Sequence, residues 1–233
     1  PVDFSLDKFS ILGGSIVLED GEGSAHIRKI DAQMGATIVG STVMVSDIAI
    51  DVDVDAPVDQ SLHLSGSIGL EAGDLVLKLD ALEFGGILAS VSGGVEDVET
   101  QPDLNVQVQL KSLDPATVEA LAGEPMLKEP LTGTIGVKGP MGALSVSSSL
   151  TGASQQGTLG LRLEANLEAD PVEWTVTLEP EAFSVDALTD LVPAPFVLNS
   201  RTEVKGVGTD YPGSISAVIR STGTDQIFAG EAV

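Results

Sequence analysis

Four aspartates in the segment DIAIDVDVDA, residues 47–56, are close enough in sequence to raise the question of a metal site. Alternate residues of a strand lie about 6.6 Å apart, whereas Ca²⁺ needs oxygen ligands at about 2.3–2.6 Å. An EF-hand loop fails too, because the sixth position from Asp51 is Ala56 rather than Gly and the twelfth is Leu62 rather than Glu. The carboxylates are therefore predicted to form a solvated outer face, the alternative being a site shared with a neighbouring strand. The four are Asp47, Asp51, Asp53 and Asp55.

Other residues that could do chemistry are few. His26 and His63 are the only histidines, and surface or structural roles are predicted for both, against roles as general base or metal ligand. The serines at 147–149 lack a G-x-S-x-G elbow, and the glycines within 133–139 neither open a helix nor precede a P-loop lysine. With no Cys in the chain, disulfides and thiolate sites are excluded. We expect no enzyme activity, catalytic residue, metal or cofactor.

Charge and length narrow the class of protein. The net charge of −24 over 233 residues argues against nucleic acid, because phosphates need clustered Lys and Arg. It also disfavours flat docking on an anionic membrane. There is no signal peptide and no apolar run long enough to span a bilayer. Both ends read as cut from a longer protein, since PVDFSLDKF already alternates at its second residue.

The elements that must position these residues are strands. Apolar and polar residues alternate along most of the chain, for instance over 104–111 and 159–168. This period of two is typical of strands with one buried and one solvated face. Glycine pairs at 13–14, 85–86 and 93–94 are read as turns between strands. The predicted fold class is all-β, an antiparallel meander of a dozen or more strands.

Two short helices interrupt the strand pattern. Asp114 can cap a helix near 115–122, with Pro115 in the first turn and Gly123 ending it. Ser184 can cap a second helix over 184–191, which stops before Pro193.

The two helices occur in the same context, which indicates an internal repeat. Leu113, Val118 and Leu121 match the residues Phe183, Leu188 and Leu191. Repeats of this kind stack into an elongated body. We therefore predict one elongated segment over 1–233, made of a β-meander over 1–103, a first repeat over 104–152 and a second repeat over 174–223.

The strand, LDPATVEAL helix and LTGTIGVKGPMGALSVSSSL strand pair, followed by GTLGLRLEANL, resemble the AsmA/TamB-like family of bacterial envelope proteins. The opening ILGGSIVLEDGEGSAHIRKIDAQM is similar to hairpins of the same family. The resemblance implies a long, curled β-groove in the periplasm, anchored to the inner membrane by a segment outside this chain. It implies transport of phospholipid between the two membranes, or assistance to outer-membrane protein assembly.

One face of such a sheet cannot stay in water, so it must close, pack on another layer or hold a ligand. A 16-carbon acyl chain needs on the order of 12 kcal/mol of shelter, at roughly 0.8 kcal/mol per CH₂. A closed sandwich or barrel core fits the alternation equally well. The residues predicted to line a lipid groove are Ile48, Ile50, Val52, Val54, Leu62, Leu64, Leu75, Leu77, Leu79, Val106, Val108, Ile135, Val137, Leu159, Leu161, Leu163, Trp174, Val176 and Leu178.

The leading hypothesis is a periplasmic lipid-transfer segment that shields phospholipid acyl chains. The alternatives are a scaffold or chaperone for outer-membrane protein assembly, and a structural or adhesive β-repeat module with a closed core. The expected partners are phospholipid acyl chains, the rest of the same chain at both ends and an outer-membrane barrel protein, with no nucleic acid.

Overall fold

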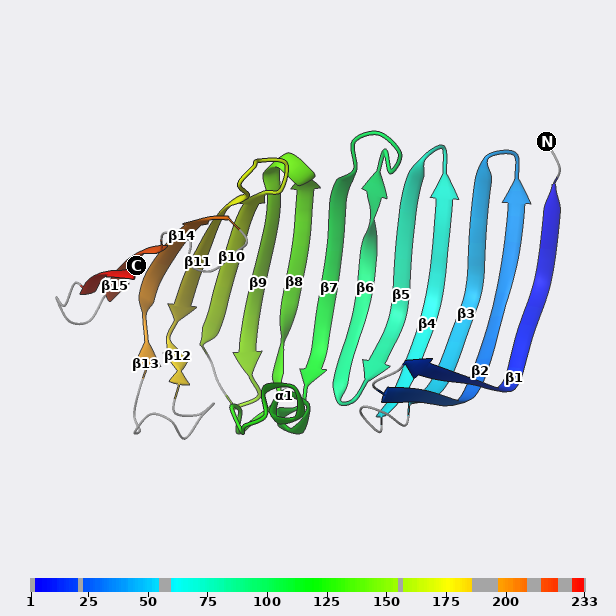
Figure 1. Ribbon diagram of the computed structural model, residues 1–233, viewed down its shortest axis with the longest axis horizontal. Coiled ribbons are helices and arrows are strands. Elements are labelled where there is room, and N and C mark those ends of the chain that lie inside the picture. The colour runs from blue at the N-terminus through cyan, green and yellow to red at the C-terminus, as the bar shows by residue number, and fades with distance from the viewer. Residues whose placement is uncertain are drawn as a thin grey trace. The chain divides into compact units, whose positions relative to one another are not determined.

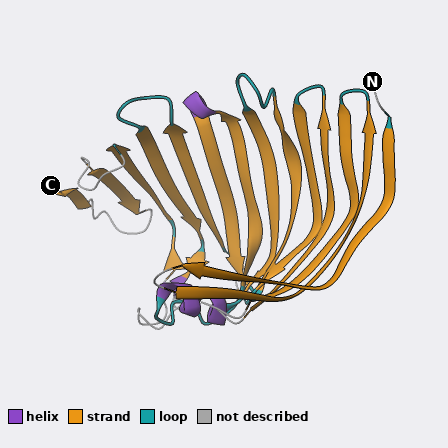
Figure 2. Ribbon diagram, turned by 45° about the vertical axis from the view of Figure 1, so that its right-hand side comes forward, coloured by secondary structure: helices purple, strands orange, loops and turns teal. Residues whose placement is uncertain are grey.

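The structure is a computed structural model that describes residues 3–20, 23–54, 60–154, 157–185, 197–208, 215–221 and 228–232. The chain divides into two compact units, unit 1 over Pro1–Thr100 and unit 2 over Gln101–Val233. Figures 1 and 2 show that each unit is dominated by long neighbouring strands. The predicted all-β meander is confirmed, and neither unit closes into a barrel.

Unit 1 is an antiparallel meander in which each strand pairs with the next along the chain. The connections are short, and Ala72 and Gly73 both have positive φ, which fits a two-residue hairpin turn. The strands are β1 (Phe4–Asp20), β2 (Gly23–Val39), β3 (Thr42–Val54), β4 (Gln60–Glu71), β5 (Asp74–Phe84) and β6 (Ile87–Glu96).

Unit 2 continues the same design with two insertions between neighbouring strands. Along the chain, the helix comes between β7 and β8, and these two strands pair directly with each other. The small β12–β13 sheet comes between β11 and β14, which also pair directly. The elements are β7 (Asp103–Leu113), α1 (Pro115–Ala122), β8 (Leu131–Pro140), the 3-10 helix η1 (Met141–Ala143), β9 (Leu144–Gly152), β10 (Thr158–Asn166), β11 (Glu173–Glu181), β12 (Phe183–Ser184), β13 (Val197–Leu198), β14 (Ser200–Val207), β15 (Ile215–Ser221) and β16 (Phe228–Ala232).

The first predicted helix is confirmed together with its caps. The backbone N–H of Ala116 donates to Asp114 Oδ1 at 2.8 Å, and Pro115 occupies the first turn. Gly123 has φ 80° and donates its N–H to the carbonyl of Glu119 at 2.8 Å, which ends the helix. The second predicted helix falls mostly on residues 186–196, outside those the structure describes.

Two of the predicted glycine turns are wrong. Gly85–Gly86 does connect β5 to β6, but Gly13–Gly14 lies within β1 and Gly93–Gly94 lies within β6. Gly13 has φ 66° and sits beside a register shift, so it makes an irregularity inside a strand rather than a turn. The ends of β1 and β2 that follow each other along the chain (dark blue in Figure 1) turn away from the direction of the other strands of unit 1.

The buried core of the described residues is small. In unit 2, Leu131 and Phe183 form a buried cluster, against which four half-buried apolar residues pack. Those four are Leu113, Leu127, Leu159 and Val185. Within the described parts of the chain, the only sheet besides the meander strands is the β12–β13 pair. No described second layer therefore turns the meander into a sandwich.

Candidate functional site

The apolar residues of unit 2 form ladders across neighbouring strands. Directly opposed residues of an antiparallel pair share a face, with Cβ atoms about 4.5–5.5 Å apart. One ladder passes through six strands in order, and a second runs beside it. They are Val106–Val137–Val146–Leu163–Val176–Val204 and Val108–Ile135–Ser148–Leu161–Leu178–Thr202. We call the face that carries them the apolar face of unit 2.

Unit 1 has ladders of the same kind from β3 to β6, and we call the face that carries them the apolar face of unit 1. Each crosses four strands, with an aliphatic residue at nearly every step. They are Val52–Leu62–Phe84–Ile87, Ile50–Leu64–Leu82–Ala89, Ile48–Gly66–Leu79–Val91, Val45–Ile68–Leu77–Gly93 and Val43–Leu70–Leu75–Val95. Most residues predicted to line a groove thus lie on the apolar face of their own unit. Val54, Leu159 and Trp174 are outside these ladders but share the face by alternation along their strands.

Bulges extend the apolar face of unit 1 beyond the residues that alternation alone identified. Between Val45 and Ile48 the register of β3 shifts, with Asp47 at φ 51°. The extra residue reverses the alternation, so Val43 and Val45 share a face with Ile48 although their numbers differ in parity. Between Leu79 and Leu82 of β5, a second shift does the same. The sequence signal that identifies these missed residues is the break in alternation itself.

The apolar faces are partly covered rather than sealed. Within unit 1 the buried apolar residues are Ala32, Ile48 and Ala89, at 8%, 6% and 2% exposure. Most ladder residues of both units stay at intermediate exposure, and Leu161 is 36% exposed. These side chains pack against their neighbours along and across strands. Leu159, near one end of the apolar face of unit 2, also packs against the Leu131–Phe183 cluster. The described residues form no second full sheet that could cover the ladders. An aliphatic surface of this extent is typical of a binding site rather than of an ordinary protein surface.

The opposite face of unit 1 is polar and pairs its side chains across strands. His63 Nδ1 lies 2.7 Å from Asp51 Oδ1, and Glu83 stands opposite His63 on β5. Ser61 donates to Asp53 Oδ1 at 2.8 Å. Strand register thus places carboxylates on both sides of His63, which the residues next to it in sequence did not predict. Among the described residues, no group of three His, Asp or Glu side chains is arranged to hold a metal ion.

The aspartate row is less regular than its sequence suggests. Asp51 and Asp53 lie on the polar face, since each stands opposite a polar residue of β4. Asp47 is a bulge residue with positive φ and is exposed, while Asp55 lies outside the described residues. The side chain of His26 is also outside the described part of the chain. Of the serines, Ser147 and Ser149 lie on the polar face of unit 2, but Ser148 stands in an apolar ladder.

The only tryptophan of the chain lies at one end of the apolar face of unit 2. Trp174 stands opposite Ala165 and Gly206, and its indole N–H donates to the carbonyl of Gly208 at 3.3 Å. A Cβ at position 206 would lie 2.0 Å from Cζ2 of the ring. Glycine at 206 is therefore what lets the indole lie flat over β14, while Gly208 holds its polar edge.

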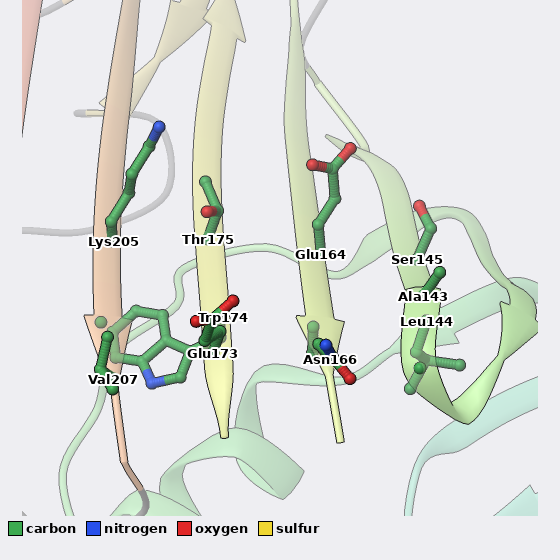
Figure 3. Close-up of a pocket in the computed structure, with 13 residues that line it drawn as sticks. Ala143, Leu144, Ser145, Glu164, Asn166, Glu173, Trp174, Thr175, Lys205 and Val207 are labelled. Carbon is green, nitrogen blue, oxygen red and sulfur yellow. The ribbon is translucent and has the colours of Figure 1, made fainter. Parts of the chain in front are cut away.

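An open cavity of about 540 Å³ lies at this end of β9, β10, β11 and β14. Figure 3 shows the row Ser145, Glu164, Thr175 and Lys205 on four neighbouring strands, with Trp174 and Val207 beyond it. The register confirms this row as directly opposed residues. Charged groups of both signs thus stand on the polar face of unit 2, one residue along the strands from the row of Trp174.

Comparison with known proteins finds no match among protein-family models, curated proteins or solved structures. No helix among the described residues is long and apolar enough to cross a membrane.

Proposed function

We propose that this chain is a periplasmic lipid-transfer segment whose apolar faces shield phospholipid acyl chains on their way between the inner and outer membranes. The observation that carries the proposal is the set of aliphatic ladders, which cross strand after strand without a described second full sheet over them. Apolar surface removed from water contributes about 25 cal/mol per Å². An acyl chain that lies along a ladder therefore removes both its own apolar surface and that of the ladder side chains from water.

The side-chain chemistry of the ladders suits a ligand of variable length. They consist mostly of Val, Ile and Leu, and aromatic residues make up only 3% of the chain. A wall of this kind offers dispersion contacts along its whole length and no hydrogen bond that would fix one position. Polar and charged side chains occupy the other face. For example, Glu164, Thr175 and Lys205 lie directly opposite one another on the adjacent strands β10, β11 and β14.

In this proposal each sheet curls around its ligand, and residues 104–152 and 174–223 are two copies of one structural repeat. Two features support the repeat. An insertion follows β7 and another follows β11, and in each case the next long strand returns to pair with the strand before the insertion. Leu113 and Phe183, equivalent in the sequence alignment of the repeats, also belong to the same apolar cluster. The resemblance to AsmA/TamB-like proteins leads to the same assignment.

Native mass spectrometry of the purified chain, produced in a bacterium and kept free of detergent, tests the proposal. We expect adducts with the masses of diacyl phospholipids. Val176→Asp places a carboxylate in a ladder between Leu163 and Val204 and should abolish these adducts. The control Thr175→Asp changes the adjacent residue on the polar face and should retain them. A parent protein that carries no phospholipid would contradict the proposal.

A further inference from the structure

The polar face of unit 2 carries two neighbouring rows of side chains that can form hydrogen bonds. Each row consists of directly opposed residues on the strands β7, β8, β9, β10, β11 and β14, which are neighbours in the sheet. We call them the first and the second polar row. The first polar row is Asn105–Lys138–Ser145–Glu164–Thr175–Lys205.

The second polar row lies two residues further along each strand and therefore on the same face of the sheet. It is Gln107–Gly136–Ser147–Arg162–Thr177–Glu203.

The composition of the two polar rows differs from that of the chain. Half of the positions carry a hydroxyl or a side-chain amide, and none carries an aliphatic or aromatic side chain. Three basic side chains stand against two acidic ones, although the chain as a whole has a net charge of −24. Nucleic acid needs clustered bases, and the core of a protein interface needs apolar side chains. The rows instead suit a nearly uncharged ligand that is rich in hydrogen-bonding groups.

Much of the hydrogen-bonding capacity of the polar rows is unused. Asn105, Gln107, Arg162 and Glu164 are exposed and form no hydrogen bond or ion pair with another described residue. Thr177 is only 6% exposed, and its hydroxyl also has no partner in the described part of the chain. Buried polar groups are nearly always paired. A ligand that carries hydroxyl groups can supply the missing bond, and Arg162, which lies opposite Thr177, is exposed enough to move aside.

Two open cavities border the polar rows. The cavity of about 540 Å³ has Glu164 and Lys205 in its lining (Figure 3). A second cavity of about 300 Å³ is lined in part by Gln107, Gly136 and Lys138. Together they cover the rows from β7 to β14, and volumes of this size are typical of small-ligand sites.

The spacing of the strands matches one kind of polymer. Strands lie about 4.8 Å apart, so a row offers one side chain at each such step. This step is close to the advance per sugar of a β-1,4-linked glycan. Successive sugars of that glycan are turned over, so their substituents point to alternate sides, as two parallel rows require. The amides of Asn105 and Gln107 each offer a donor and an acceptor, which complement the N–H and C=O of an acetamido group.

We propose that the polar face of unit 2 binds a β-1,4-linked glycan of N-acetylated sugars, which lies across the strands along the two polar rows. Asn105 and Gln107 bond its acetamido groups, and Ser147, Thr175 and Thr177 bond its hydroxyls. The site is on the opposite face from the aliphatic ladders, so neither this proposal nor the lipid-transfer function depends on the other.

Isothermal titration calorimetry of the 233-residue chain tests the proposal with three tetrasaccharides. Chitotetraose has β-1,4 linkages and acetamido groups, cellotetraose has the linkage alone, and maltotetraose has neither. We expect saturable binding of chitotetraose at millimolar concentration or below, weaker binding of cellotetraose and no binding of maltotetraose.

Two substitutions locate the site. Gln107→Ala removes an exposed amide and should raise the dissociation constant for chitotetraose about tenfold, and Gln33→Ala, on the polar face of unit 1, should leave it unchanged. Gly136→Val fills the smaller cavity and should abolish binding. A Cβ at position 136 meets only Ser147 Oγ, at 3.3 Å, so this variant should melt close to the parent temperature.

The outcomes separate cleanly. A parent that does not bind chitotetraose at millimolar concentration would overturn the proposal. Equal binding of chitotetraose and maltotetraose would also overturn it, because the row spacing and the amides would then select nothing. Binding that Gln107→Ala leaves unchanged would place the glycan elsewhere on the chain and contradict the assigned site.

Discussion

Single residues decide how closely a side chain of the apolar face can approach the backbone of a neighbouring strand. Trp174 lies over Gly206 because that position has no Cβ, and the indole N–H is satisfied by the Gly208 carbonyl. Sequence alternation placed Trp174 on the apolar side, but it could not predict its glycine partner, which lies 32 residues later on a different strand. The pairing of His63 with Asp51 was missed for the same reason, since register is a property of two strands rather than one.

Replacing Gly206 by Ala should displace the indole ring, because the new methyl group would lie 2.0 Å from Cζ2. We expect a loss of about 1–3 kcal/mol in unfolding free energy, as for other overpacked sites. Since the chain has one Trp, its fluorescence reports this site alone and should shift to the red. The control Gly136→Ala, whose added Cβ meets only Ser147 Oγ at 3.3 Å, should leave the spectrum unchanged. An unchanged spectrum for Gly206→Ala would refute the packing described.

At the scale of elements, alternation predicted the strands well and their irregularities poorly. The ladders of β7–β11 follow an uninterrupted alternation, and here the apolar face was predicted correctly from the sequence. In β3 and β5 the alternation changes parity within one strand, which requires a bulge. A bulge adds one residue to a strand and has no composition signal of its own. Val43 and Val45 were therefore not recognised as residues on the same face as Ile48. Gly13–Gly14 was mistaken for a turn because a glycine pair can mark an irregularity inside a strand as well as a turn between strands.

The bulge at Asp47 gives an element-scale prediction. Its φ of 51° lies in the left-handed region, which Asn tolerates and β-branched residues do not. Asp47→Ile should lower the unfolding free energy by about 1–2 kcal/mol, and Asp47→Asn should change it by less than about 0.5 kcal/mol. Chemical denaturation of both variants measures the difference. Equal stabilities would show that position 47 is not held in this conformation.

At the scale of the whole molecule, length, charge and alternation together indicated an acidic all-β protein with one apolar and one polar face per sheet. The structure has this arrangement in each unit, with 35 acidic residues in the chain and no described second full sheet over the ladders. Whether such a face stays open could not be predicted from alternation, because a sandwich core has the same period of two. The proposed lipid function depends on this openness.

The most direct test of that function is a pair of substitutions at neighbouring residues of β7, Val106→Asp and Gln107→Asp, assayed by melting and by crosslinking to a phospholipid with a photoreactive acyl chain. Val106 lies in a ladder beside Val137, and Gln107 lies on the polar face beside Gly136. In an open face the carboxylate of Val106→Asp stays solvated without lipid, so the protein should remain folded and lose crosslinking, while Gln107→Asp retains both properties. In a closed core the buried unpaired carboxylate would cost several kcal/mol, enough to unfold a domain of ordinary stability. Unfolding of Val106→Asp, together with no lipid captured by the parent, would contradict the account.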